Sequence, residues 1–308
     1  MSAGGSKRAV LAALLANLGI AVAKLIGFAL TRSSSMLAEG VHSLADTGNQ
    51  LLLLLGGRRA QLAPNEAHPF GYGRERYFWA FVVSIVLFTL GSAFAIFEGV
   101  EKLLHPHQVD SPAVAIAILL VAVVLEGFSF RTAVRESDPL RQGASWPQFI
   151  RRAKIPELPV LLLEDSGALV GLTIALVCLG LTMVTGSAVW DGLGSTLIGL
   201  LLGVIAAVLA TEMKSLLIGE SASADDQKAI EAAITGAPSV LTVIHLRTEH
   251  LGPEELLVGA KVDFDPTLSF AALATAIDEV ERRIRSAVPA ARVIYIEPDV
   301  ARPAEPLA

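Results

Sequence analysis

Residues 36–55 read MLAEGVHSLADTGNQLLLLL, an apolar stretch interrupted by polar and charged side chains. These side chains belong to Glu39, His42, Asp46 and Asn49, which stand at positions i, i+3, i+7 and i+10. On a helix of about 3.6 residues per turn, these positions share one face. The stretch therefore predicts a helix that is apolar around most of its circumference and carries a single polar stripe.

The composition places this helix in a membrane. Of the 308 residues, 53% are hydrophobic and 18% are charged, and the mean hydropathy is +0.59, far above that of soluble globular proteins. A membrane span needs about 20 predominantly apolar residues. We therefore expect an integral, multi-pass membrane protein in contact with the lipid bilayer. Six windows meet the requirement, at roughly 9–30, 36–57, 77–99, 112–134, 159–184 and 190–212.

Lys and Arg are distributed unevenly among the predicted connections, and this bias sets the orientation of a membrane protein. The connections after the first, third and fifth windows carry only Arg32 and Lys102. The N-terminus and the other two connections are basic. We therefore expect both termini on the cytoplasmic side of a cell (inner) membrane. The basic residues are Lys7, Arg8, Arg58, Arg59, Arg74, Arg76, Arg131, Arg135, Arg141, Arg151, Arg152 and Lys154.

The composition changes after Lys214. Residues 215–308 contain 8 Lys+Arg and 15 Asp+Glu, a net charge of −7, whereas residues 1–214 contain 16 and 15. We predict a six-span membrane domain, 1–214, followed by a small cytoplasmic α+β domain, 215–308, of αββαβ (ferredoxin-like) order, with two helices on one face of a three-stranded sheet. Periodicity and cap residues predict helices at 224–236 and 269–288 and strands at 239–250, 255–265 and 291–298.

His42 and Asp46 are candidate metal ligands, because side chains four residues apart on a helix converge and offer one nitrogen and one oxygen to a divalent cation. The alternative is a purely structural role, in which the two side chains form hydrogen bonds to neighbouring helices and bind no metal.

In the fifth window, Glu164 and Asp165 stand in the apolar run PVLLLEDSGALVGLTIAL. Two adjacent acids in a span are costly and predict a cation partner. Since neighbouring residues on a helix point about 100° apart, we expect Asp165 to be the ligand. Glu164 is then a fourth ligand from the flank, a proton carrier or a group turned towards the cytoplasmic end. Alternatively, the two acids bind no cation and only place negative charge near the positive end of the helix dipole.

Three further residues in the apolar segments are informative. Glu126 and Asp191 lie in or beside predicted spans, where each either lines a pathway or satisfies a neighbouring helix. Cys178 is the single cysteine, which excludes disulfides and thiolate metal clusters.

Together these motifs resemble the cation diffusion facilitators, a family that moves zinc and related divalent cations across membranes in exchange for protons. SSSMLAEGVHSLADTGNQ is similar to the family's second span, HPFGYGRERY to the loop that follows, and ANLGIAVAKLIGFAL, with Asn17 and Lys24, to its first span. VIHLRTEHLGPEELLVGAKV and VIYIEPD resemble its metallochaperone-like cytoplasmic domain, which dimerises. The resemblance covers nearly the whole chain.

The resemblance implies a transporter and not an enzyme: Zn2+ efflux by proton antiport through a site between the second and fifth spans. Its metal ligands would be His42, Asp46, Asp165 and Glu164. Antiport follows from the ligands' chemistry, because metal binding requires deprotonated side chains, so that metal and protons compete. We expect divalent cations, protons and a second copy of the chain as partners, no nucleic acid, and no prosthetic group.

The sequence also departs from the family pattern. Leu161 stands where many zinc-transporting members have the His of a second His-x-x-x-Asp pair. The motif LLEDSGALVG instead resembles the branch that includes the mitochondrial and nuclear-receptor-associated zinc transporter relatives. A site with one His and several carboxylates also admits Co2+, Fe2+ or Mn2+. His68, His245 and Glu297 lie where some relatives bind further metal, but their neighbours are poor ligands.

Two other functions remain compatible with the sequence. Asp46 and Asp165 would form the dyad of an intramembrane aspartyl protease, although neither stands in the Tyr-Asp or Gly-x-Gly-Asp context and His42 would have no role there. A non-transporting metal sensor, whose tail signals to a partner, is the second alternative. Metal-dependent proton flux separates all three functions.

Overall fold

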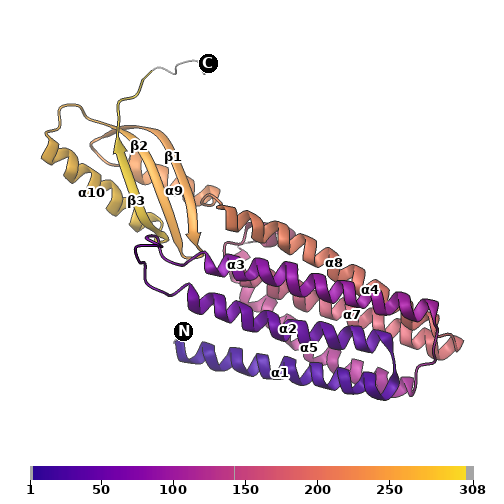
Figure 1. Cartoon of the computed structure of the whole chain (residues 1–308). Coiled ribbons are helices and arrows are strands. Elements are labelled where there is room, and N and C mark those ends of the chain that lie inside the picture. Colours follow the sequence, from indigo (N-terminus) through magenta and orange to yellow (C-terminus); the bar gives the residue numbers. More distant parts are fainter. Residues whose placement is uncertain (1–2, 142, 303–308) are drawn as a thin grey trace. The chain divides into compact units, whose positions relative to one another are not determined.

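The structure is a computed structural model that describes residues 3–141 and 143–302. The chain separates into two compact units. The first comprises Met1–Arg58 and Tyr77–Lys214, and the second comprises Arg59–Arg76 and Ser215–Ala308. Figure 1 shows that the first consists of long helices and that the second contains a small sheet with its own helices.

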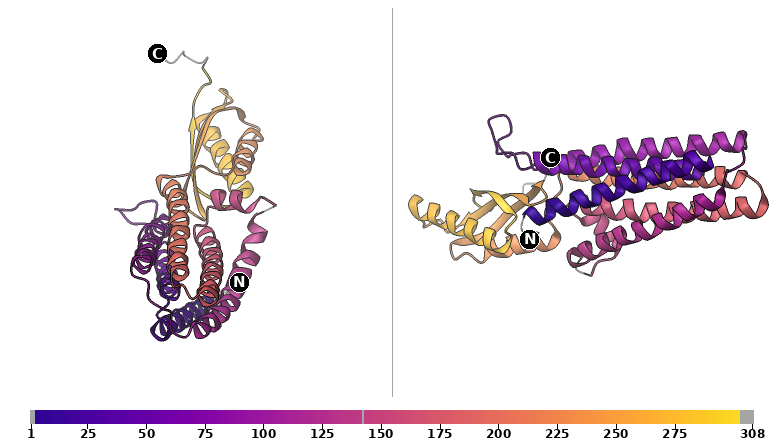
Figure 2. Two further views of the ribbon diagram at one scale, coloured as in Figure 1. Left: turned by 90° about the vertical axis from the view of Figure 1, so that its right-hand side faces the viewer. Right: turned by 90° about the horizontal axis from the view of Figure 1, so that it is seen from below.

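The first unit is a bundle of long helices that lie side by side (Figures 1 and 2). Five of the six predicted windows each lie on one long helix, and the third, 77–99, spans two consecutive helices and the π-helical segment that joins them, so the six helical spans are confirmed. A short helix between the fourth and fifth spans was not predicted. The helices are α1 (Ala3–Thr31), α2 (Ser34–Arg59), α3 (Glu75–Val82), α4 (Phe88–Leu104), α5 (Pro112–Arg141), α6 (Trp146–Arg152), α7 (Glu157–Thr185) and α8 (Val189–Ile218). A π-helical segment, Val83–Leu87, joins α3 to α4.

Among the residues that the structure describes, four helices are long and apolar enough to cross a membrane: Glu75–Leu104, Pro112–Arg141, Glu157–Thr185 and Val189–Ile218. In α1, the described apolar part is the shorter segment Asn17–Thr31.

Helix α2 is less apolar than these four helices because it carries polar residues on its buried face. Its leucines Leu44, Leu51 and Leu54 are exposed, whereas its polar stripe faces the bundle interior. This inside-out distribution suits a helix with lipid on one side and a polar site on the other.

Helices α4 and α8 approach each other closely because glycines face the contact. A Cβ on Gly99 of α4 would lie 2.7 Å from the carbonyl oxygen of Gly192 on α8. On α8, a Cβ at Gly199 would lie 2.7 Å from the backbone nitrogen of Ile96. Small residues at helix contacts are typical of membrane bundles, in which packing replaces the hydrophobic effect between helices.

Asp191 of α8 fixes the start of α2. Its Oδ2 accepts hydrogen bonds from the backbone nitrogen of Ser34 at 2.7 Å and forms an ion pair with Lys102 Nζ at 3.2 Å. Its Oδ1 accepts from Ser33 Oγ at 2.6 Å. A carboxylate that binds free backbone N–H groups at a helix N-terminus stabilises that helix. Asp191 therefore satisfies a neighbouring helix, and α2 enters the bundle in a fixed position.

The second unit has the predicted αββαβ order. Strands β1 and β2 pair antiparallel, and β2 and β3 pair parallel, so that β2 is central. The Oγ of Ser269 accepts a hydrogen bond from the backbone nitrogen of Ala272 at 3.3 Å, so Ser269 is the N-cap of the helix predicted at 269–288. The elements are α9 (Ala224–Thr235), β1 (Val240–Gly252), β2 (Glu255–Phe264), α10 (Phe270–Ala287) and β3 (Ala291–Pro298).

The core of this unit lies between its helices and one face of the sheet. Burial alternates along β2, so that Val258, Ala260 and Val262 are buried, whereas Gly259 and Lys261 between them are only partly buried. Ile230 of α9 and Ile284 of α10 pack into the same cluster. Both helices therefore cover the same face, as the sequence predicts.

The connection Arg59–Arg76 packs with this unit, which the sequence did not indicate. Arg74 forms an ion pair with Glu249 of β1. A Cβ on Gly73 would lie 2.7 Å from the carbonyl oxygen of Leu251, so the backbone of the connection touches the turn between β1 and β2. Glycine is needed here because a side chain would separate the two segments.

We predict that residues 215–308 fold without metal and that Ile284→Ala lowers the free energy of unfolding by about 3 kcal/mol, because it leaves a cavity in a fully buried cluster. Urea unfolding of this fragment in the presence of a chelator measures the effect. Leu241→Ala, at a residue with 63% exposure, is the control and should change the stability by less than about 0.5 kcal/mol. Unfolding on chelation, or equal losses in the two variants, would contradict this account of the core.

Candidate metal centre

The polar stripe of α2 lies inside the bundle. Glu39, His42, Asp46 and Asn49 are all at most 4% exposed. His42 Nδ1 lies 3.4 Å from Asp46 Oδ1, which is the convergence that their four-residue spacing predicts. A Cβ on Gly171 of α7 would collide with Glu39 Oε1, so α7 closely approaches the stripe.

Glu164 and Asp165 of α7 are both buried, at 2% and 3% exposure. The charges of both interact with that of Asp46. The sequence predicts Asp165 as the ligand and leaves Glu164 as a fourth ligand from the flank, a proton carrier or a group turned towards the cytoplasmic end. The side chains of Glu164 and Asp165 point about 100° apart. Both can be buried because other helices pack against α7 on more than one side.

The two acids of α7 differ in how they are held. Asp165 Oδ2 accepts a hydrogen bond from Ser129 Oγ of α5 at 3.0 Å. The side chain of Asn49 lies beside the Glu164 carboxylate, but within the described residues neither side chain has a partner in good hydrogen-bond geometry. A buried carboxylate without hydrogen bonds is strongly unfavourable. Glu164 is therefore the acid in this group that most needs a proton or a cation.

Helix α5 contributes a further acid. The charge of Glu126 interacts with those of Asp46, Glu164 and Asp165, and its Oε1 lies 3.9 Å from Lys24 Nζ. Glu126 and Ser129 are three residues apart and therefore face the same side of α5. In the sequence, the signal for Ser129 is its position three residues after Glu126 in an apolar span, which places both side chains on one polar face.

The candidate ligands do not form a closed coordination shell. In the described part of the chain, no group of three or more His, Cys, Asp or Glu side chains is arranged to hold a metal ion. The structure pairs His42 with Asp46 and holds Asp165 on Ser129, with Glu164 between other acids. What it brings together is a buried, mainly anionic cluster from α2, α5 and α7.

The weaker candidates of the sequence are held by other contacts. In the exposed connection Arg59–Arg76, Asn65 Oδ1 accepts a hydrogen bond from the backbone nitrogen of His68 at 2.8 Å, and its Nδ2 donates to Tyr72 Oη at 2.8 Å. On the sheet, Lys261 Nζ lies 3.0 Å from Glu297 Oε1, and hydrogen bonds to Glu297 and Asp299 raise the pKa of Lys261. Glu297 is therefore paired with an ammonium group in this structure.

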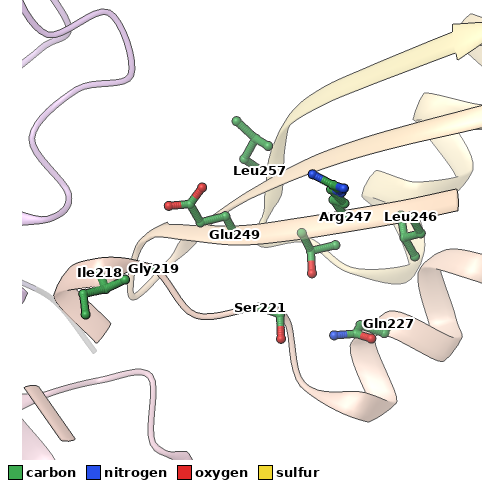
Figure 3. A pocket seen from close by; sticks show the side chains of 9 residues that line it. Ile218, Gly219, Ser221, Gln227, Leu246, Arg247, Glu249 and Leu257 are labelled. Atoms are coloured by element: carbon green, nitrogen blue, oxygen red, sulfur yellow. The ribbon is translucent and has the colours of Figure 1, made fainter. Parts of the chain in front are cut away.

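One surface depression lies elsewhere, on the second unit. It has a volume of about 640 Å³, and its polar lining includes Ser221, Gln227, Arg247 and Glu249 (Figure 3). None of the predicted metal ligands lines it. It is therefore separate from the buried cluster.

Comparison with known sequences identifies the class of protein that this bundle and domain define. Residues 10–218 match the family described as "Cation efflux transmembrane domain", and residues 222–299 match "Cation efflux protein, cytoplasmic domain". The chain therefore belongs to the cation diffusion facilitator (cation efflux) family. Members of this family are transporters and not enzymes, which removes the aspartyl protease from the alternatives.

Individual relatives agree with the predicted branch. The chain is 34% identical over 244 residues to "Proton-coupled zinc antiporter SLC30A9, mitochondrial" of Xenopus laevis, which covers 79% of this chain and 44% of that protein. The Homo sapiens protein of the same name is also 34% identical, with 79% and 43% covered. "Metal tolerance protein C4" of Arabidopsis thaliana is 29% identical over 262 residues, with 84% and 57% covered. The chain thus spans about half the length of these relatives.

We predict that Glu164→Gln raises the unfolding temperature of the metal-free protein by a few degrees, corresponding to about 1 kcal/mol, because it removes a buried carboxylate without hydrogen bonds. The same change should weaken zinc binding by about tenfold or more. Thermal unfolding and zinc titration of the full-length protein measure the two effects. Glu136→Gln, at an exposed position of α5, is the control and should change neither. A Glu164→Gln protein with lower stability and unchanged zinc affinity would show that Glu164 is a structural group.

Proposed function

We propose that the protein moves a divalent metal cation, zinc before Co2+, Fe2+ or Mn2+, across a membrane in exchange for protons. The observation that supports this most strongly is the imbalance of charge inside the bundle. Five carboxyl groups, those of Glu39, Asp46, Glu126, Glu164 and Asp165, are buried in the bundle. Among the described residues, the ammonium group that pairs with members of this cluster is that of Lys24, which lies beside Glu39 and Glu126. Five anions beside one cation are not stable in a low-dielectric interior, so the cluster must bind cations or protons.

The imbalance suits exchange as well as binding. A divalent cation supplies two positive charges, and protons supply the same charge when the cation leaves. Because the two compete for the same side chains, loading with metal displaces protons, and protonation releases metal. A buried site that opens to one side at a time converts this competition into antiport, with movement of helices around the site.

The ion in this proposal is held by His42 and Asp46 of α2 and by Asp165 of α7, with Glu164 as the fourth group. One imidazole nitrogen and carboxylate oxygens are donors that zinc accepts in tetrahedral sites. The names of the relatives, which describe proton-coupled zinc antiporters, favour zinc as the cargo.

We further propose a homodimer that assembles through residues 215–308, supported by the match of this segment to the family's cytoplasmic domain. The bias of Lys and Arg supports an orientation with both termini on the cytoplasmic side of a cell (inner) membrane. The relatives named as mitochondrial make the inner membrane of that organelle the alternative location.

The proposal is tested by zinc flux and proton counterflow in proteoliposomes that contain the full-length protein. The wild type should transport zinc against an opposing pH gradient, and His42→Ala and Asp46→Ala should each abolish flux while leaving the protein folded, because each removes a ligand without opening a large cavity. Asp110→Ala, at an exposed acid outside the buried cluster, is the control.

Three results are informative. Zinc flux without proton counterflow would contradict antiport, and unimpaired flux in Asp46→Ala would contradict the site. Tight zinc binding by a wild-type protein that shows no flux would favour the metal sensor.

A further inference from the structure

Lys24 of α1 is a charged side chain in the interior of the membrane bundle. Its exposure is 0%, and its Nζ donates hydrogen bonds to Ser43 Oγ at 2.7 Å and to Glu39 Oε2 at 3.1 Å. Glu126 Oε1 lies 3.9 Å away. These partners belong to α2 and α5, so Lys24 joins three helices.

The position of Lys24 is informative because of what lies beside it. Ser43 follows His42 directly, and Glu39 is on the same face of α2, one turn from His42. The charge of Lys24 interacts with those of His42 and Asp46 as well as with its direct partners. A fixed positive charge therefore stands next to the proposed ligands, although a buried ammonium group is itself costly.

Hydrogen bonds between helices of this bundle do not require a positive charge such as that of Lys24. Elsewhere in the bundle, Ser92 Oγ and Ser195 Oγ join helices through hydrogen bonds to the backbone oxygens of Gly199 and Ala95, at 2.7 and 2.8 Å. The presence of an ammonium group thus calls for an electrostatic explanation.

We propose that Lys24 is a positioning residue that weakens the binding of the cargo ion, so that the ion can leave. Its positive charge repels a divalent cation held by His42 and Asp46, and it keeps Glu39 and Glu126 engaged on the side away from the ion. Glu126 has the opposite effect and strengthens binding. The inference rests on the proposed transport function and adds to it the control of ion release.

The proposal requires opposite effects from two neighbouring substitutions. In Lys24→Gln the repulsion is lost and two carboxylates are released, so the zinc dissociation constant should fall by about tenfold. In Glu126→Gln an attraction is lost, and the dissociation constant should rise by a similar factor. The double variant Lys24→Gln/Glu126→Gln should bind zinc about as tightly as the wild type, because the two charges cancel.

Transport distinguishes this role from simple attachment of helices. In proteoliposomes, Lys24→Gln should lower both KM and kcat for zinc, because tighter binding slows release. Lys24→Arg should restore wild-type values, since it keeps the charge. The matched control is Lys102→Gln, which removes another fully buried lysine, one that pairs with Asp191, and should reduce thermal stability without tightening zinc binding.

The decisive measurements are zinc titration and initial transport rates of the full-length wild type and variants, with thermal unfolding as a check of folding. If wild-type protein transports zinc but Lys24→Gln binds it equally or more weakly, the inference is overturned and the proposed function stands. If Lys24→Gln does not fold, Glu126→Gln alone decides, and unchanged or tighter zinc binding in that variant overturns the inference. If the wild type shows no zinc flux, the proposed function fails and the inference falls with it.

Discussion

The structure depends on one constraint, which is that carboxylates buried inside a membrane bundle must be compensated by positive charge. Five such groups lie on α2, α5 and α7, and in the part of the chain that the structure describes, Lys24 is the counter-charge paired with two of them. A soluble protein would hydrate these acids or replace them. Here they remain in an apolar environment, which is stable only if protons or metal cations occupy the cluster. In the proposed function, this charge of the interior is what drives the binding and exchange of cations.

The rest of the fold serves to keep this cluster in place. Asp191 fixes the start of α2, and glycine contacts such as that of Gly99 hold α4 against α8. The second unit is independent of the cluster in its own packing, with a core between two helices and one face of its sheet. Within that unit, Arg74 of the connection between α2 and α3 pairs with Glu249 of β1.

Much of the fold and of the polar stripe was predictable from the sequence because both depend on local periodicity. Hydropathy defined the six long helices, alternation defined the three strands, and the spacing of Glu39, His42, Asp46 and Asn49 placed them on one buried face. Contacts between distant segments were not predictable in this way. The bond from Ser129 to Asp165 and the burial of both α7 acids depend on how helices are rotated in the bundle, which sequence spacing on a single helix does not determine.

The most direct test of a cation site between α2 and α7 is anomalous X-ray scattering at the zinc absorption edge, from crystals of the full-length protein grown with zinc. The account predicts a peak inside the bundle, about 2.0–2.2 Å from a ring nitrogen of His42 and a carboxylate oxygen of Asp46, with Asp165 or Glu164 completing the site. Zinc found only on the second unit, with no peak beside His42 and Asp46, would contradict it.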